Sequence, residues 1–320
     1  MRKRPSCPII TIEEHYWDKE LTSNYTGVEG ARDPKMLERL YDVGEIRIKD
    51  MDAHGIDMQV ISHGAPSMQK IAGDIAAGLA TRVNDRLAAA VAANPKRLAA
   101  FCCLPTADPR AAAAELERCV KLGFKGAMIH GLSNGLFLDE PQFDPIWERA
   151  QALDVPIYLH PAVPHAAVTE AYYGKYMKDF PMVIRAAWGF TVETATIAIR
   201  MVLGGVFERF PRLKIILGHL GETLPFLQWR IDQALSRPGH KTVSFRDTFS
   251  HNFYLTTSGN FSNPALLCCV MEMGIDRIMY AIDYPFVPNK PGIDWIDTIP
   301  LCDEDKAKLL SGNTKRLLKM

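Results

Sequence analysis

Two ionisable side chains near the start of the chain, Glu13 and His15, end an apolar run at residues 9–12. If this run is a β-strand, side chains two positions apart lie on the same face. A carboxylate oxygen and an imidazole nitrogen would then point into one space, where a divalent cation could bind both. The pair predicts a metal site at the end of the first strand.

The same residue types recur at the ends of later apolar runs. Histidines close four of these runs, at His63, His130, His160 and His219, and a carboxylate closes the last run at Asp283. A single histidine at a strand end is often a hydrogen-bonded polar cap. Imidazoles grouped with carboxylates, however, are typical of a cation site. The joint pattern therefore predicts that these strand ends meet around a metal ion.

Four of these residues form a candidate ligand set: Glu13, His15, His160 and Asp283. Two oxygens and two nitrogens suit Zn²⁺ or Mn²⁺, and they do not suit a soft metal that prefers thiolates. We therefore expect one divalent ion per chain. A carbamylated Lys125 could bridge a second ion, but this lysine precedes its strand and lies at the wrong end. A binuclear site is not expected.

The segment 217–222, Leu-Gly-His-Leu-Gly-Glu, places a carboxylate three residues after a histidine. Its two glycines permit a close approach of the backbone to other groups. Glu222 could orient the imidazole of His219 and fix its tautomer. The N-terminus of the following helix would favour the same carboxylate electrostatically, and the two roles are compatible.

The elements that must position these residues alternate along the chain. Eight short runs are expected strands, at residues 9–15, 58–63, 99–104, 126–130, 157–160, 214–219, 253–257 and 278–283. Helix signals lie between them, namely Asp-Pro at 33–34, 108–109 and 144–145 and Asn-Pro at 263–264. Each pair offers an N-cap oxygen followed by a proline in the first turn. This alternation predicts a parallel sheet built from βαβ units.

Eight strand–helix repeats in 320 residues favour a distorted (β/α)₈ barrel of the TIM type, in a single domain that covers residues 1–320. Catalytic residues of such barrels lie at the C-terminal ends of the strands, which is where the candidate ligands occur. An open, doubly wound sheet is the alternative fold. It is disfavoured because no Gly-x-Gly-x-x-Gly turn follows the first strand.

The composition excludes several classes of partner. The formal net charge is zero, so nothing suggests binding to nucleic acid or to an anionic membrane surface. No uninterrupted apolar run approaches the roughly 18 residues of a membrane span. The seven cysteines include adjacent pairs at 102–103 and 268–269 and no Cys-x-x-Cys. This usage predicts reduced, mostly buried thiols in a cytoplasmic protein.

Five sequence motifs resemble the amidohydrolase superfamily, and more narrowly its decarboxylase branch. They are Ile12-Glu-Glu-His15, Tyr158-Leu-His-Pro161, Ile215-Ile-Leu-Gly-His-Leu-Gly-Glu222, Thr256-Thr-Ser-Gly-Asn-Phe261 and Ala281-Ile-Asp-Tyr-Pro-Phe286. The resemblance covers essentially the whole chain. The γ-resorcylate (2,6-dihydroxybenzoate) decarboxylases look closest, because they also have a histidine at the position of His15. The resemblance implies a barrel with one Zn²⁺ or Mn²⁺ on the ligand set above, and a homodimer or homotetramer.

The activity that the resemblance implies is the metal-dependent, non-oxidative decarboxylation of a small aromatic acid of the hydroxybenzoate type. In that reaction Asp283 would deliver a proton to the ring, and His219 would hydrogen-bond the substrate. Glu222 would orient His219.

Three further residues are expected to bind the substrate. His63 and His130 depart from the family pattern and would add two imidazoles to the pocket lining. Arg230, in Trp229-Arg-Ile-Asp232, matches a family motif whose arginine approaches the site of a neighbouring subunit. Because the extra imidazoles alter the polar lining, the sequence predicts an ortho-hydroxylated benzoate without fixing its other substituents.

The sequence is also compatible with two other functions. The same ligands could activate a water molecule for the hydrolysis of a small lactone or cyclic amide, with Asp283 as the base. The two reactions differ in their products, because only hydrolysis incorporates water. A barrel that only binds a ligand is the third possibility, and the intact ligand set with His219 and Glu222 argues against it.

Overall fold

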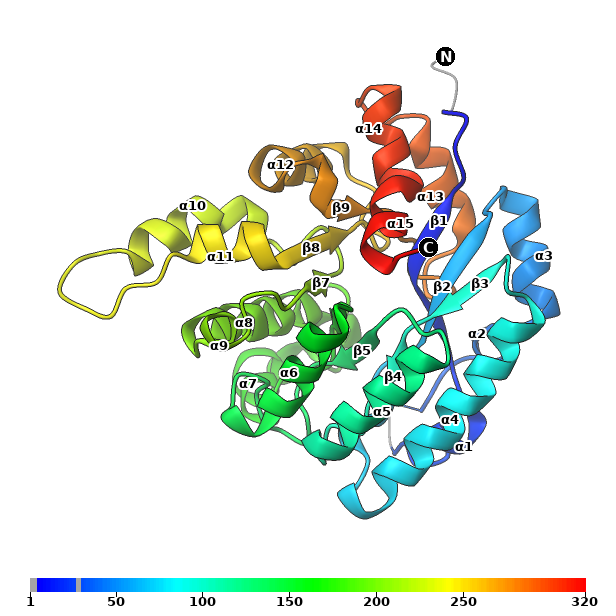
Figure 1. The fold of residues 1–320 in the computed structure, drawn as a ribbon, viewed down its shortest axis with the longest axis horizontal. Helices are drawn as coiled ribbons and strands as arrows, with labels where there is room; N and C mark the ends of the chain where they lie inside the picture. The colour runs from blue at the N-terminus through cyan, green and yellow to red at the C-terminus, as the bar shows by residue number, and fades with distance from the viewer. Residues whose placement is uncertain (1–4, 27–29) are drawn as a thin grey trace.

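The computed structural model describes residues 5–26 and 30–320 as parallel strands surrounded by helices (Figure 1). The strands are β1 Ile10–Tyr16, β2 Met58–His63, β3 Leu98–Ala100, β4 Cys102–Cys103, β5 Ala127–His130, β6 Ile157–His160, β7 Ile215–Leu217, β8 Phe253–Thr256 and β9 Ile278–Met279. The helices are α1 Lys19–Thr22, α2 Pro34–Tyr41, α3 Glu45–His54, α4 Gly73–Ala93, α5 Pro109–Lys121, α6 Asp144–Leu153, α7 Ala166–Val168, α8 Gly189–Leu203, α9 Val206–Arg209, α10 Leu224–Leu235, α11 Phe245–Asn252, α12 Asn263–Met273, α13 Asn289–Ile296, α14 Asp303–Ala307 and α15 Asn313–Leu318.

The strands form two parallel sheets that adjoin at both ends. The first has the order β1-β2-β3 and the second the order β4-β5-β6-β7-β8-β9. Only Phe101 separates β3 from β4, so the two short strands together fill the expected third strand. At the other junction, the backbone N–H of Ile12 donates to Tyr280 O at 3.1 Å. Hydrogen bonds thus connect the strands around a distorted barrel, although the assigned strands do not form one closed sheet.

Alternate residues of the strands pack together inside the barrel, as expected when interior and exterior positions alternate. The interior cluster is Ile10, Ile12, Val60, Ala99, Phe101, Met128, Tyr158, Ile216, Met279 and Ala281, against which Leu317 and Leu318 of α15 pack. Two positions beyond Met128, Tyr158 and Ala281 lie His130, His160 and Asp283. These strand-end residues therefore continue the inward-facing rows, whereas His63 is one position out of step with Val60.

In strand β1 an irregularity of the backbone is needed to turn the ligand side chains toward the barrel interior. Its pairing with β2 shifts by one residue between Ile12 and Glu14, and Glu13 has φ +71°. Because Ile12 faces the interior, a regular strand would turn Glu13 and His15 outward. A β-bulge at Glu13 shifts the alternation by one residue. The predicted convergence of Glu13 and His15 is correct, but the regular-strand reason for it was wrong.

The helix starts that the Asp-Pro and Asn-Pro pairs predict are correct to within one residue. The side chains of Asp33 and Asp108 accept backbone N–H groups at the starts of α2 and α5, as predicted. Asp144 instead lies inside α6, with Phe143 at the N-cap. At α12 the cap is Ser262, whose hydroxyl accepts the N–H of Ala265, and the Asn-Pro pair occupies the first turn. These caps fix where each helix leaves its preceding strand.

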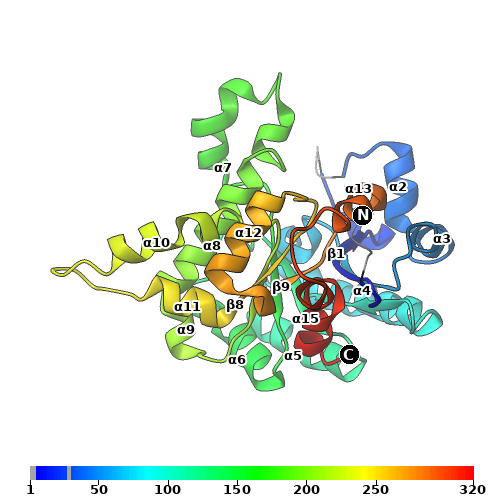
Figure 2. The same ribbon diagram turned by 90° about the horizontal axis from the view of Figure 1, so that it is seen from above.

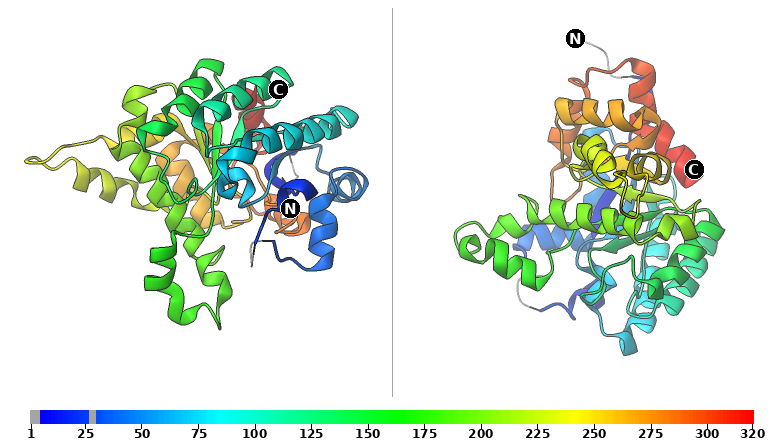
Figure 3. Two further views of the ribbon diagram at one scale, coloured as in Figure 1. Left: turned by 90° about the horizontal axis from the view of Figure 1, so that it is seen from below. Right: turned by 90° about the vertical axis from the view of Figure 1, so that its left-hand side faces the viewer.

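A helical excursion after β6 projects from the body of the molecule, as Figure 2 and Figure 3 show for the region around α7. It leads into 181–203, which is long and apolar enough to cross a membrane by length and composition alone. A core helix passes the same test, and α8 buries Ile197, Ala198, Met201 and Val202 in the main core. This face of α8 packs as a core helix does.

Candidate metal centre

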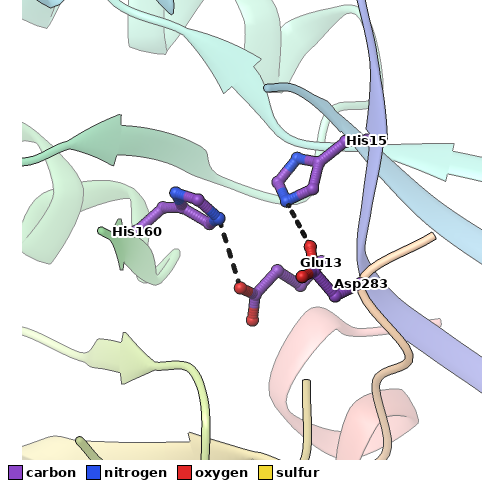
Figure 4. Close-up of side chains that lie close together, drawn as sticks. All are labelled: Glu13, His15, His160 and Asp283. Carbon is purple, nitrogen blue, oxygen red and sulfur yellow. Dashed lines mark ion pairs between the residues drawn. The ribbon is translucent and has the colours of Figure 1, made fainter. Parts of the chain in front are cut away.

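Four side chains from three parts of the barrel meet at the C-terminal ends of the strands. One potential ligand atom from each of Glu13, His15, His160 and Asp283 lies within 4.8 Å of the others. His15 Nε2 lies 3.2 Å from Asp283 Oδ1, and His160 Nε2 lies 3.4 Å from Glu13 Oε1 (Figure 4). The structure thus brings together all four residues of the predicted ligand set.

The two oxygens of the Glu13 carboxylate have different surroundings. Oε2 accepts hydrogen bonds from the hydroxyls of Tyr158, Thr256 and Ser258. Oε1 has no hydrogen-bond partner and lies 3.7 Å from His219 Nε2. The three hydroxyls therefore fix the carboxylate and leave one oxygen available to an ion.

Gly218 makes room for this carboxylate. A Cβ atom at that position would lie 2.7 Å from Glu13 Oε2, closer than real Cβ contacts allow. The close approach that the sequence predicted for this glycine is therefore present, and its partner is Glu13.

The unpartnered atoms of the cluster fit a cation. Glu13 Oε1, His15 Nε2 and Asp283 Oδ1 are buried and lack hydrogen-bond partners. Burial lowers the pKa of His15 to about 4 and that of His160 well below its usual value. Both imidazoles are therefore neutral and carry a lone pair, which is the form that binds metals. Hydrogen bonds leave Nε2 of each ring as the outward nitrogen, because Nδ1 of His160 lies 2.7 Å from Pro161 O and Nδ1 of His15 lies 3.4 Å from Ser62 Oγ.

The two carboxyl groups are costly to ionise without a cation. Burial raises the pKa of Glu13 and the pKa of Asp283 to about 7. Nearby negative charges contribute, since Asp283 acts on Glu13 and Glu222 acts on Asp283. A divalent ion would offset both effects. The donor set of two carboxylates and two neutral imidazoles therefore fits Zn²⁺ or Mn²⁺.

The backbone around the cluster adopts conformations that side chains usually avoid. Seven of the eleven non-glycine residues with positive φ in the described chain lie at these strand ends: Glu13, His219, Leu220, Glu222, Thr223, Ser258 and Asp283. Such residues cost about 1–3 kcal/mol each and persist where the surroundings over-determine them. Their concentration here marks the functional site independently of the ligand chemistry.

His219 and Glu222 form the predicted pair beside the cluster. His219 Nδ1 lies 2.7 Å from Glu222 Oε1, so the Nδ1–H group donates a hydrogen bond to this carboxylate. Burial alone would lower the pKa of His219, but the charges of Glu222 and Glu13 overcome it and raise the pKa to about 10. The imidazole is therefore cationic at neutral pH, and its Nε2–H faces the cluster.

The structure does not bring His63 into the pocket, which corrects the sequence prediction. Its Nε2 accepts the backbone N–H of Asp18 at 2.9 Å, and its Nδ1 donates to Gly64 O at 2.8 Å. Both ring nitrogens are occupied, so none is available to a substrate. The physical reason is strand alternation, because β2 turns position 63 away from the barrel interior.

His130 does face the cluster. Its ring centroid lies 4.7 Å from that of His160 and 6.4 Å from that of His15. The side chain is 1% exposed, and neither ring nitrogen has a hydrogen-bond partner. It is thus a buried, neutral imidazole next to the ligands, although it does not line the cavity described next.

A cavity of about 1180 Å³ opens beside His219 and Asp283, which both line it. Its outer part is lined by Phe226 of α10 and Met271 of α12, which are 80% and 83% exposed. Arg230 lies on the exposed side of α10 and does not line this cavity. The structure therefore does not bring Arg230 to the site of its own chain.

Sequence reasoning missed several residues of the site. Tyr158, Thr256 and Ser258, which bind Glu13, lie within the family-like motifs but were given no role. Their signal was positional, because Tyr158 is two residues before His160 and therefore on the same face of β6. Glu14 was missed as well, because it looked like a neighbour of the ligands rather than a part of the site.

Comparisons with known proteins agree with this geometry. The amidohydrolase family model matches residues 10–320. The chain is 40% identical to the γ-resorcylate decarboxylase of Polaromonas sp. strain JS666, with 97% of this chain and 98% of that one covered. A crystal structure of dihydroxybenzoic acid decarboxylase from Polaromonas sp. JS666, with bound manganese and the inhibitor 2-nitroresorcinol, has a TM-score of 0.88 at 39% identity, covering 98% and 97%. The 5-carboxyvanillate decarboxylase of Sphingomonas paucimobilis has a TM-score of 0.90 at 34% identity, covering 98% and 100%.

The chain belongs to the amidohydrolase family. The predicted fold and family are confirmed, and so is the expectation of a divalent metal cofactor, since a manganese-bound relative matches and this chain holds a suitable cluster. The chain is a metal-dependent decarboxylase of aromatic carboxylic acids, as the resemblance implied.

Proposed function

We propose that this enzyme removes CO₂ from a benzoate with a hydroxyl group ortho to the carboxylate, and that 2,6-dihydroxybenzoate is the first substrate to test. The observation that carries the proposal is the cluster of Glu13, His15, His160 and Asp283, which adjoins a cavity large enough for a monocyclic acid. The 40% identity to a γ-resorcylate decarboxylase supports the choice of substrate.

The cluster would hold one Zn²⁺ or Mn²⁺ through Glu13 Oε1, the two imidazoles and Asp283. When bound, the ion would neutralise and orient the carboxylate and ortho oxygen of the substrate. The three hydroxyls on Glu13 Oε2 fix the carboxylate, so that its other oxygen would be free to hold the ion. In this proposal the four cluster residues bind the ion, and the ion orients the substrate.

Asp283 is the proposed proton donor. Its carboxyl group lines the cavity beside the cluster, so a proton that it takes up from solvent or from the incoming acid lies within reach of the substrate. The proton goes to the ring carbon that bears the carboxylate. The bond between that carbon and the carboxylate then breaks, its electron pair returns to the ring, and CO₂ leaves. Asp283 afterwards regains a proton from solvent.

His219 and Glu222 have supporting roles in this proposal. Because Nδ1–H of His219 is held by Glu222, its Nε2–H is directed toward the cluster and can donate to a substrate oxygen. The positive charge of the imidazole favours an anionic substrate. Glu222 preserves both the orientation and the charge of the ring.

His130 and Arg230 complete the proposed substrate contacts. His130 has two unpartnered ring nitrogens beside His160 and can contact a group on a bound aromatic acid. Arg230 would act on the site of a neighbouring subunit. His63 has no substrate role in this proposal, because both of its ring nitrogens are occupied.

We also propose that the chain is a single domain and that it assembles as a homodimer or homotetramer. Phe226, Trp229 and Met271 are between 66% and 83% exposed, and α10 packs against α12. Exposed apolar surface of this kind beside a cavity is typical of an interface. We also propose a cytoplasmic location, since all seven cysteines are free thiols.

The test is a product assay with metal-loaded enzyme. We expect 2,6-dihydroxybenzoate, or another ortho-hydroxylated benzoate in a panel with 5-carboxyvanillate, to yield CO₂ and the corresponding phenol. A benzoate without an ortho hydroxyl should not react and serves as the control. Hydrolysis of small lactones with ¹⁸O uptake from water, and no CO₂ from any acid, would instead establish the hydrolase alternative.

A further inference from the structure

The carboxylate of Glu14 lies directly behind the proposed metal ligands. The side chain is fully buried, with 0% exposure. Its Oε1 accepts the backbone N–H of Ile282 at 3.0 Å, and its Oε2 accepts the backbone N–H of Tyr284 at 2.9 Å. These two amides flank Asp283, so Glu14 forms hydrogen bonds to the backbone on both sides of that residue.

The two segments that Glu14 joins are both irregular. Glu13 has φ +71° and Asp283 has φ +73°, a region that residues with a side chain rarely adopt. Each such conformation costs about 1–3 kcal/mol and requires support from its surroundings. Each oxygen of the Glu14 carboxyl group accepts one backbone N–H beside Asp283. Glu14 therefore supplies support at the place where the backbone needs it.

A second buried side chain reinforces this junction. The guanidinium of Arg47, which is 1% exposed, donates to His15 O through Nη2 and lies 5.0 Å from the ring centroid of Tyr284. The backbone N–H of His15 in turn donates to Tyr284 O at 2.6 Å. A buried carboxyl group and a buried guanidinium thus hold β1 and the Asp283 segment together.

We propose that Glu14 is a positioning residue, which holds Asp283 turned toward Glu13 and His15 and thereby sets the affinity of the metal site. It does not contact the ion or the substrate. The inference rests on the proposed function only in requiring that the cluster binds a divalent ion. Residues that orient metal ligands typically change metal affinity or activity by about 10–100-fold when they are replaced.

The test compares Glu14→Gln with the wild-type protein in titrations with Mn²⁺ alone, with free Mn²⁺ followed by electron paramagnetic resonance. Glutamine offers one acceptor oxygen and an amide that cannot accept the second N–H. We expect Mn²⁺ binding to weaken by about 10–100-fold. The visible absorption spectrum of the Co²⁺-loaded variant should also change, because the ligand geometry differs.

Glu115→Gln is the matched control. Glu115 is a 6% exposed carboxylate on α5 that also accepts several hydrogen bonds, from Asn84, Arg118 and Cys119. This replacement removes a buried charge away from the cluster, so it should lower the unfolding temperature while Mn²⁺ affinity and the Co²⁺ spectrum stay unchanged.

The outcomes separate the positioning role from the proposed function. Wild-type affinity and an unchanged Co²⁺ spectrum in a folded Glu14→Gln variant would overturn the positioning role alone. If wild-type protein binds no divalent ion, both proposals fail. If Glu14→Gln does not fold, Glu14→Asp decides. It keeps the carboxyl group with both oxygens but is one methylene shorter, so a folded variant should bind Mn²⁺ more weakly, and unchanged affinity would refute the role.

Discussion

The two sides of the site differ in how completely one chain builds them. The metal side is closed: Glu13, His15 and His160 are at most 5% exposed, and hydroxyls or backbone groups hold each of them. The cavity side is open, with Phe226 and Met271 largely exposed. One chain therefore supplies every proposed metal ligand, whereas its cavity stays open beside exposed apolar side chains, where we propose that a second copy binds.

Asp283 belongs to both sides, so its replacement should have the largest effect. Asp283→Asn keeps a coordinating oxygen but cannot donate a proton from it. We expect kcat to fall by about 10²–10⁴-fold while metal content by elemental analysis is retained. His219→Ala should be nearly as damaging. Near-normal turnover by fully metal-loaded Asp283→Asn would show that another group donates the proton.

The metal side should respond strongly to pH. Because burial raises the pKa of Glu13 and that of Asp283 to about 7, the metal-free site holds protons that an ion must displace. Apparent affinity should fall by about tenfold per pH unit below pH 7 for each displaced proton, and level off above pH 7. His15, with its pKa at about 4, should not compete above pH 5. Calorimetric Mn²⁺ titrations between pH 5.5 and 8 test this, and a flat profile would contradict it.

The raised pKa values of Glu13 and Asp283 also determine how the stability of the metal-free fold changes with pH. The folded pKa of both carboxyls lies above the usual 4.5 and 3.8. Their contribution therefore stabilises the metal-free fold at low pH and is lost as pH rises through 7. Bound metal removes this penalty, so the increase in unfolding temperature on adding Mn²⁺ should be largest above pH 7.

The cavity side should depend on assembly. Trp229→Asp places a charge on an exposed, apolar part of α10, and removing a large aromatic anchor from an interface can cost about 2 kcal/mol or more. We expect sedimentation analysis to show smaller species and decarboxylation to fall, with Mn²⁺ affinity unchanged. Lys241→Ala, at an exposed position after α10, is the control. An unchanged assembly would remove α10 from the interface.

The smallest effects should separate the two histidines that the sequence treats alike. His63→Ala leaves the backbone N–H of Asp18 and the carbonyl of Gly64 without partners, which should destabilise the fold by about 1–3 kcal/mol. The folded variant should keep its KM. His130→Ala should raise KM with a smaller loss of unfolding temperature. Equal effects of both variants on KM would mean that position 63 does reach the substrate.

The sequence was most informative where the chain is regular. The eight-strand pattern, the residues at the strand ends and the His219–Glu222 pair could all be predicted, because strand alternation and residue type suffice for them. Position 63 was misjudged since counting strand ends ignores which face the last residue occupies. The bulge at Glu13 could not be foreseen, because nothing in the residues 9–15 requires a non-glycine residue at positive φ.

The bulge at Glu13 has a consequence for protein engineering. Residues before it follow the spacing of the barrel interior, and residues after it follow the spacing that the metal site needs. Copying residues 10–15 onto a regular strand of another barrel, with Ile10 and Ile12 kept in the interior, would leave the side chains of Glu13 and His15 on its outer surface. A transplanted site therefore needs the extra residue as well as the ligands. Equally, deleting Glu13 would remove the bulge and leave Glu14 and His15 opposite Ile61 and Ser62, as they are now. His15 would still face the barrel interior, but no carboxylate of this strand would join it there.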